Sequence, residues 1–170
     1  KVRMQRGVFY TPRPVVSFIV RSVDELLRKD FGLEDGLADT TTWEEMAKKS
    51  KELKIPEGTN LNDPFVQILD PATGTGTFLV EVINLIHKTM VEKWEDHGNS
   101  EKKIDQLWND YVPKHLLPRL HGYELLMAPY AIAHMKIGLK LYETGYEFGS
   151  EERARIYLTN ALEPEKDFSS

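Results

Sequence analysis

The side chains best placed to do chemistry lie in residues 68–78, ILDPATGTGTF, where an apolar stretch leads into an acid and a glycine-rich turn. The apolar pair before Asp70 predicts a short buried strand, which puts this acid where parallel strands present side chains to a crevice. Gly74 and Gly76 permit positive φ and let the backbone approach a ligand closely. The sequence therefore predicts a site for a polar or anionic ligand.

A long amphipathic helix is predicted to follow this turn, because apolar residues recur at helical intervals from Phe78 onward. The free amides of its first turn would face the same crevice. Two familiar phosphate-binding loops are excluded. The dinucleotide fingerprint needs a third glycine where Leu79 stands, and a P-loop needs a GK[ST] ending that is absent.

Residues 7–12, GVFYTP, precede a second predicted helix over residues 15–27. Tyr10 offers an aromatic wall, Thr11 offers a hydroxyl that can donate to a carboxylate, and Pro12 favours the first turn of a helix. The alternative interpretation is an ordinary helix start without a ligand.

Residues 120–124, LHGYE, predict a short strand that ends in Glu124, followed by a helix over residues 128–142. In a doubly wound fold, an acid at the end of the second strand can accept hydrogen bonds from both hydroxyls of a ribose. Residues 154–162, ARIYLTNAL, predict a third strand that ends near Asn160, whose amide could recognise an adenine amine or could simply start a turn.

The spacing between the glycine turn and Glu124 is much longer than the usual about 20 residues. Residues between them must hold the long helix and an insertion, within which a short helix is predicted to end at Pro113. Asp105 and Asp110 are alternative ribose ligands, but neither follows a strand-like run.

These segments resemble, in order, motifs X, I, II and III of the adenine-N6 DNA methyltransferases of restriction-modification systems that have the gamma motif order. The string DPATGTGTF carries most of the resemblance to motif I, GVFYTP resembles motif X, and GYELLMAPYAIA resembles motif II. The resemblance implies an α/β, Rossmann-like, S-adenosylmethionine-dependent methyltransferase fold. It covers the N-terminal half of the sheet with flanking helices and a helical N-terminal extension.

The resemblance also implies a cofactor site for S-adenosyl-L-methionine. In it Thr11 would donate to the methionine carboxylate, Asp70 would anchor the amino group, and Glu124 would hold the ribose. Leu125 and the residues after the third strand would hold the adenine. The implied site comprises Tyr10, Thr11, Pro12, Asp70, Pro71, Ala72, Thr73, Gly74, Gly76, Phe78, Glu124, Leu125, Asn160, Ala161 and Leu162.

The catalytic signature of that family, [DNS]PP[YF], does not occur, since no two prolines are adjacent in the sequence. Residues 62–65, NDPF, precede motif I and carry Asp where the first Pro belongs, so we interpret them as a turn. We therefore assign no catalytic residue. We expect a cofactor-binding piece of a longer polypeptide, beginning at Lys1 instead of Met and inactive alone. Its parent would carry a target-recognition domain and a nuclease or helicase.

Residues 1–64 are predicted to form the motif X helix and an insertion, and residues 65–170 the Rossmann-like core, together one cofactor-binding part. The apolar content of 41% suffices for one hydrophobic core. A net charge of -5 argues against a free-standing DNA binder, so DNA is expected as a partner of the parent enzyme. The basic residues Lys1, Arg3, Arg6 and Arg13 are interpreted as a solvated face.

Composition narrows the remaining possibilities. Cysteine is absent, the histidines lack metal-binding spacing and no apolar run is long enough for a membrane span, so we expect a cytoplasmic protein without a metal. Two alternative functions stay open. One is a methyltransferase of the same fold that acts on RNA, protein or a small molecule, and the other is a non-enzymatic nucleotide-binding module.

Overall fold

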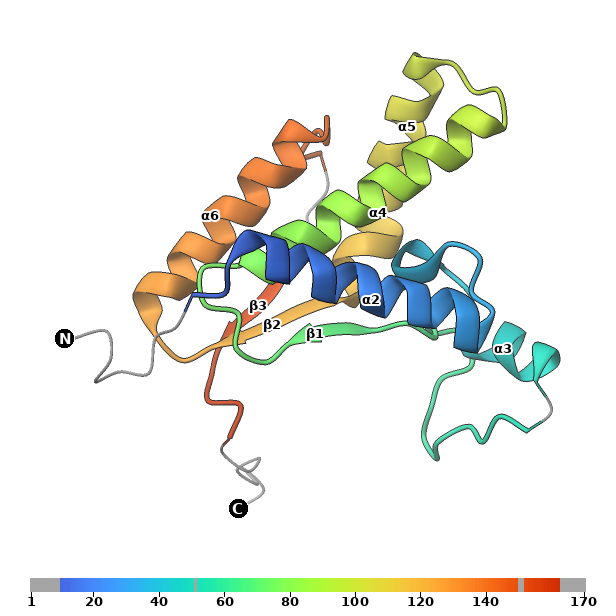
Figure 1. Cartoon of the computed structure of the whole chain (residues 1–170), viewed down its shortest axis with the longest axis horizontal. Helices are drawn as coiled ribbons and strands as arrows, with labels where there is room; N and C mark the ends of the chain where they lie inside the picture. The colour runs from blue at the N-terminus through green and yellow to red at the C-terminus, as the bar shows by residue number, and fades with distance from the viewer. Residues whose placement is uncertain (1–9, 51, 150–151, 163–170) are drawn as a thin grey trace.

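The computed structural model describes residues 10–50, 52–149 and 152–162, which form an α/β fold (Figure 1). Three parallel strands make the sheet: β1 (Ile68–Asp70), β2 (Leu120–Glu124) and β3 (Arg155–Leu158), in that spatial order. Parallel neighbours require crossover connections, and helices supply them here. The expected α/β class is confirmed, and the small parallel sheet is consistent with part of a Rossmann-like fold.

Helices make up the rest of the described fold. The long helix α4 packs between α2 and α6, and α4 and α5 form a hairpin that extends away from the sheet (Figure 1). The helices are α2 (Arg13–Phe31), α3 (Trp43–Lys49), α4 (Thr77–Asp96), α5 (Glu101–Tyr111) and α6 (Met127–Glu143), with short turns η1 (Gly36–Ala38), η2 (Val112–Leu116) and η3 (Leu117–Arg119).

The bounds predicted from local sequence patterns agree closely with several of the observed helices and strands. The predicted strand over residues 120–124 has the observed bounds of β2. Helix α2 extends beyond the predicted residues 15–27, because Pro12 precedes its first turn and Gly32 ends it in the left-handed conformation. Thr42 caps α3 in a capping box with Glu45, and Glu44 and Glu45 lie in the first turn of this helix.

The short helix that was predicted to end at Pro113 is α5, which ends two residues earlier, and the turns that follow it were not predicted. Helix α5 ends at Tyr111, but the chain continues through the π-helical turn η2 and the 3-10 turn η3 as far as Arg119. Pro113 lies in the first turn of η2, where its missing N–H costs no hydrogen bond. This compact path delivers the chain directly to β2.

The hydrophobic core lies between the sheet and helices α2, α4 and α6. Val16 and Val20 of α2 are buried against α4, so the N-terminal helix is part of the main core. A second cluster joins Leu33, Met46 and Val66, which come from both sides of the predicted boundary at residue 64. Each such side chain stabilises the fold by about 1.5–3 kcal/mol on burial.

A buried arginine also joins the N-terminal segment to the sheet. Arg119, immediately before β2, is fully buried and donates to the Asp39 carbonyl (3.0 Å), the His115 carbonyl (2.5 Å) and the Tyr111 hydroxyl (2.6 Å). The Tyr111 hydroxyl in turn donates to the Ala38 carbonyl at 2.6 Å. These bonds fix the segment around Ala38 beside the start of β2.

In the described part of the chain, none of the helices combines the length and the apolar character that a membrane span requires.

Candidate functional site

The site begins where β1 ends at Asp70 and the chain turns through residues 71–76 into α4. The Ala72 amide donates to Asp70 Oδ1 at 3.1 Å, and the Thr73 hydroxyl donates to the Asp70 carbonyl at 3.1 Å. The Gly76 amide donates to the Thr73 carbonyl at 2.9 Å and closes the turn. The loop therefore holds its own shape and fixes the carboxylate of Asp70.

Glycine is needed in this loop for two different reasons. Gly74 and Gly76 have φ of 56° and 81°, in the left-handed region that other residues rarely adopt. Gly76 also lies against α6, because a Cβ there would stand 3.3 Å from the Cα of Ala133. The predicted role of these glycines in a tight turn agrees with the geometry, while the contact with α6 had no signal in the local sequence.

The loop is also locked to β2. The buried Thr73 donates its amide to the Tyr123 carbonyl at 2.9 Å, and its side chain lies over Gly122. A Cβ on Gly122 would stand 2.4 Å from Thr73 Oγ1, closer than any real contact. Sequence reasoning missed Gly122, although a glycine inside a strand often marks such a close approach.

Glu124, at the end of β2, reaches the glycine loop directly. Its Oε2 accepts from the Gly74 amide and its Oε1 from the Leu126 amide, both at 2.8 Å. Its own carbonyl accepts from the Thr159 amide at 2.8 Å, just beyond β3. Because each carboxylate oxygen can accept a second bond, Glu124 holds the loop and can still bind hydroxyls.

Asp70 carries the strongest sign of a missing partner. Its Oδ2 is buried and has no hydrogen-bond partner among the described residues, whereas buried carboxylate oxygens are normally paired. Burial raises the pKa of Asp70 above its ordinary value, the Ala72 amide opposes this rise, and the nearby charge of Glu124 adds to it. A cation at Oδ2 would satisfy this carboxylate.

Two cavities flank the loop. A small one of about 80 Å³ lies over the loop amides and is lined by Tyr10, Thr11, Ala72, Thr73, Gly74, Thr75, Thr77, Phe78 and Pro129. The loop thus meets Tyr10 and Thr11, and Pro129 of α6 is an unpredicted part of the wall. A larger, apolar cavity of about 450 Å³ between α2 and β1 is lined in part by Asp70, Pro71 and Phe78.

Other predicted residues lie elsewhere. Pro12 caps α2, where its carbonyl accepts from the amides of Val15 and Val16. Leu125 and Leu162 are 62% and 93% exposed. Glu124, Leu125, Asn160, Ala161 and Leu162 line neither cavity. Asn160 Oδ1 accepts from the Leu162 amide at 3.1 Å, which is the turn-forming contact of the alternative interpretation.

Some sequence predictions fall outside the described residues. These are residues 7–9 of the motif X segment and the basic residues Lys1, Arg3 and Arg6. Within the described part of the chain, no group of three or more His, Asp or Glu could hold a metal ion. The alternative ribose ligands Asp105 and Asp110 lie on α5, away from the carboxyl ends of the strands.

The fold is similar to segments of three solved structures, whereas no protein-family model and no curated protein matches the sequence. The first is a nuclease-deletion mutant of the Type ISP restriction-modification enzyme LlaGI with a DNA substrate mimic, at 28% identity and a TM-score of 0.55. The second is a DrdV–DNA complex, at 30% identity and a TM-score of 0.52. The third is the ATP-dependent Type ISP restriction-modification enzyme LlaBIII bound to DNA, at 29% identity and a TM-score of 0.54.

These similarities cover 90%, 92% and 91% of this chain but only 9%, 11% and 8% of the LlaGI, DrdV and LlaBIII chains. The chain therefore spans about a tenth of the length of the enzymes that it matches. LlaGI and LlaBIII are restriction-modification enzymes, which supports that part of the expectation from sequence. Adenine-N6 methylation and the cofactor stay predictions. This chain is thus similar, in sequence and in fold, to one segment within large DNA-bound enzymes of restriction-modification systems.

Proposed function

We propose that this chain is the S-adenosylmethionine-binding part of an adenine-N6 DNA methyltransferase within a larger restriction-modification enzyme. The observation that carries the proposal is the buried, unpartnered Oδ2 of Asp70 beside the glycine loop. The motif order and the similarity to segments of restriction-modification enzymes support the same assignment. They also indicate a restriction-modification system and DNA as the partner, neither of which can be inferred from the geometry of the site alone.

Charge favours this cofactor over other adenine nucleotides. S-adenosylmethionine carries an ammonium and a sulfonium, and a cation near Asp70 Oδ2 would supply the missing hydrogen bond and lower the raised pKa of this carboxyl. A dinucleotide would instead bring a pyrophosphate toward the carboxylates of Asp70 and Glu124. Like charges repel, so the site selects against that ligand.

Each part of the site has a role in binding and orientation. Asp70 would anchor the amino group, and the amides of the loop would line the methionine moiety. Thr11, which borders the cavity over the loop, would donate to the carboxylate. Glu124, already fixed by two backbone amides, would accept from the ribose hydroxyls with its remaining lone pairs. When bound, the cofactor would supply an activated methyl group.

The chain itself is expected to bind the methyl donor without transferring the methyl group. The residues that aim an adenine amine at the methyl belong to an NPPY-type motif, which this sequence lacks. In the complete enzyme, we expect direct displacement at the methyl carbon by the N6 nitrogen of an adenine flipped out of the duplex.

Calorimetric titration of the 170-residue chain with S-adenosylhomocysteine and with S-adenosylmethionine tests the proposal. We expect both to bind and NAD to fail. Asp70→Ala should weaken binding by about 1.5–3 kcal/mol, the value of a hydrogen bond to a charged group. Asp63→Ala is the matched control, because Asp63 lies in an exposed turn and only its backbone makes hydrogen bonds in the structure.

Two results would contradict the proposal. Failure of the folded chain to bind either ligand would remove the cofactor, and unchanged affinity in Asp70→Ala would make the acid purely structural. Transfer of labelled methyl groups to adenine in DNA by this chain alone would show that the expected dependence on an NPPY-type motif is wrong.

A further inference from the structure

Helix α6 exposes an apolar face that the fold does not use. Ile132, Met135, Leu139 and Tyr142 recur at intervals of three, four and three residues, so they line one side of the helix. They are 40%, 66%, 55% and 70% exposed. We name these four residues the α6 ridge.

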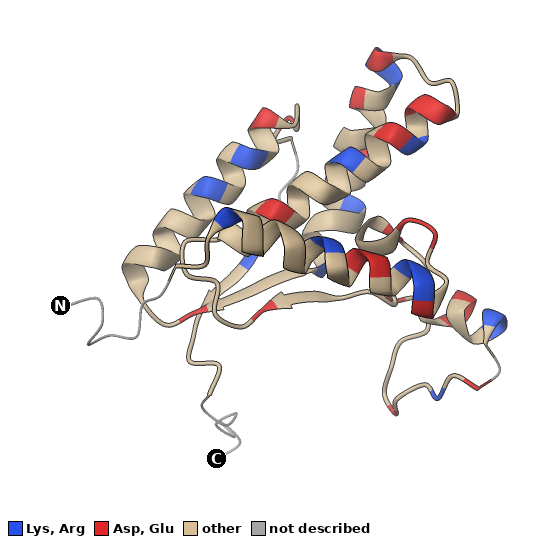
Figure 2. Cartoon of the chain, viewed as in Figure 1, with Lys and Arg blue, Asp and Glu red and all other residues tan. Residues whose placement is uncertain are grey.

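The core does not need this ridge. The opposite side of α6 already supplies the buried residues Ala133, Ile137 and Leu141, which pack into the main core. Isolated apolar residues on a surface are ordinary, but a contiguous row of large ones marks an interaction surface. The only charged residues of α6 are Lys136, Lys140 and Glu143, and the rest of the helix is uncharged (Figure 2).

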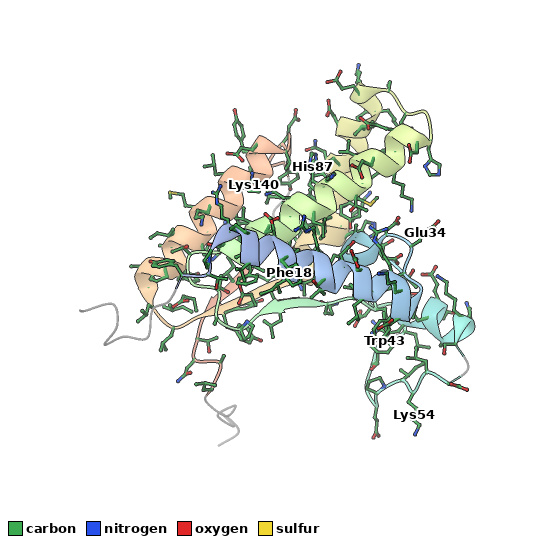
Figure 3. The ribbon with its side chains drawn as sticks, in the orientation of Figure 1. Phe18, Glu34, Trp43, Lys54, His87 and Lys140 are labelled. Atoms are coloured by element: carbon green, nitrogen blue, oxygen red, sulfur yellow. The ribbon has the colours of Figure 1, made fainter. Side chains whose placement is uncertain are left out.

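A polar groove runs along one side of the ridge. Its cavity of about 630 Å³ lies among α2, α4 and α6, and Leu139 belongs both to the ridge and to the groove wall. Lys140, labelled in Figure 3, lines the same wall. Arg13 from α2 and Lys136 from α6 also line this groove, which we name the basic groove.

One of the two acids in the basic groove is paired with a lysine, while two cations of the groove have no acidic partner among the described residues. Glu143 pairs with Lys140 at 2.6 Å, and Glu81 accepts from the Ser17 hydroxyl. In the described part of the chain, neither Arg13 nor Lys136 has a carboxylate within ion-pair distance. The hydrogen bond of Lys136 is a long one, 3.4 Å to the Thr77 hydroxyl. The groove therefore presents two cations without an acidic partner, beside one carboxylate, Glu81, whose charge the Ser17 hydroxyl does not neutralise.

We propose that the α6 ridge and the basic groove together dock an amphipathic helix of another protein domain, with acidic residues beside its apolar stripe. The spacing of the ridge suits side-by-side packing with a helix of matching period. The flanking acids of that helix would reach Arg13 and Lys136, and such charge pairing fixes its orientation. The basic groove adjoins the proposed cofactor site, since Thr11 and Thr77 line both cavities, but the inference does not depend on a ligand at that site.

A nucleic-acid ligand fits this surface less well than a helix does. DNA phosphates would pair with the cations of the groove, but they would leave the α6 ridge uncovered. An acidic amphipathic helix satisfies both parts at once, because aromatic and methionine side chains are favoured in the buried centre of protein interfaces.

The test uses a fluorescent helical peptide of about three heptads with Leu at the a and d positions. One version has Glu at the flanking e and g positions, and its control has Lys there. In anisotropy titrations we expect the 170-residue chain to bind the Glu peptide at least about tenfold more tightly than the Lys peptide. Met135→Glu should weaken binding of the Glu peptide at least about tenfold.

A charge swap tests the groove separately. Arg13→Glu combined with Lys136→Glu should reverse the preference toward the Lys peptide. Lys103→Glu is the matched control, since Lys103 is an exposed lysine on α5. Peroxide footprinting gives a second measurement: the Glu peptide should slow oxidation of Met135 but not of Met127. Met127 is 62% exposed at the start of α6 and lies off the ridge.

Several outcomes would overturn the proposal. Equal binding of the two peptides, or full binding by a folded Met135→Glu or Leu139→Gln variant, would show that the ridge and the groove do not act together. Binding of a DNA duplex that depends on Lys136 but not on Met135 would assign the groove to nucleic acid. Self-association that Met135→Glu abolishes would assign the ridge to a second copy of this chain. Circular dichroism of each variant checks folding.

Discussion

The two ends of β2 differ in whether the charged side chains beside them find hydrogen-bond partners within the protein. At its beginning, the guanidinium of Arg119 is fully buried and makes hydrogen bonds to two carbonyls and a hydroxyl. At its end, Glu124 is partly exposed and bonds to loop amides, and beside it Asp70 keeps one buried oxygen without a partner. Both ends therefore contain buried polar groups that are costly to desolvate. Only at the beginning of β2 does the protein itself supply the hydrogen-bond partners.

This difference separates a structural site from the site at which we propose that a ligand binds. A buried charge with satisfied hydrogen bonds stabilises one arrangement of the surrounding segments, and a ligand has nothing to add there. An unsatisfied buried oxygen costs the folded state free energy until something binds it. A bound ligand could therefore stabilise the protein at the carboxyl end of β2, where a buried oxygen lacks a partner, but not at the beginning of this strand.

The largest effect on stability is expected at the beginning of β2, where Arg119 is buried. Arg119→Met would remove the buried hydrogen bonds to the Asp39 carbonyl and the Tyr111 hydroxyl, and each buried group left without its partner costs about 1–3 kcal/mol. We expect the free energy of unfolding in urea to fall by roughly 2–6 kcal/mol. Cofactor affinity of the folded fraction should stay unchanged.

Lys114→Met is the matched control for Arg119→Met. Lys114 lies in the same helical stretch, is 66% exposed and makes only a surface ion pair with Asp110 at 3.8 Å. Its loss should change stability by less than about 1 kcal/mol. If Arg119→Met proved as stable as the unchanged protein, relief of the desolvated charge would outweigh the lost hydrogen bonds, and the comparison between the two ends would fail.

A smaller effect is expected where β2 meets the glycine loop. Gly122→Ala would push a Cβ toward Thr73 Oγ1, and such overpacking costs about 1–3 kcal/mol. The same change should weaken cofactor binding, because it displaces the loop that positions Asp70. Thr73→Ala removes the obstructing atom, so Gly122→Ala should cost much less stability in that background. A double-mutant cycle from urea unfolding that gave purely additive effects would rule out this contact.

The smallest expected effect is a pH-dependent gain in stability at Asp70. Burial raises the folded-state pKa of this carboxyl above the ordinary 3.8, so the ionised form destabilises the protein at pH values above the folded-state pKa. This cost disappears as the pH falls through the folded-state pKa. Asp70→Asn should therefore raise Tm at neutral pH and lose this advantage in acid, while weakening cofactor binding. A lower Tm at pH 7 would contradict the assignment.

Much of the fold could be predicted from local patterns. The bounds of β2, the cap at Thr42 and the turn around Gly74 and Gly76 depend on residues close together in the sequence. The path after α5 could not, because Arg119 at its end bonds to the Asp39 carbonyl, which lies 80 residues away in the sequence. The exposed ridge of α6 was equally hidden, since an apolar helix can pack on both faces.

Sequence alone determined the kind of site: an acid, a glycine turn and a second acid, each at the expected end of an element. The tertiary structure decided how these parts act on one another. It joined Glu124 to the Gly74 amide, placed Thr73 over Gly122, and buried Asp70 Oδ2 without a partner. These contacts link residues far apart in the chain, and burial depends on every element packed around an atom. No local pattern encodes either of these properties.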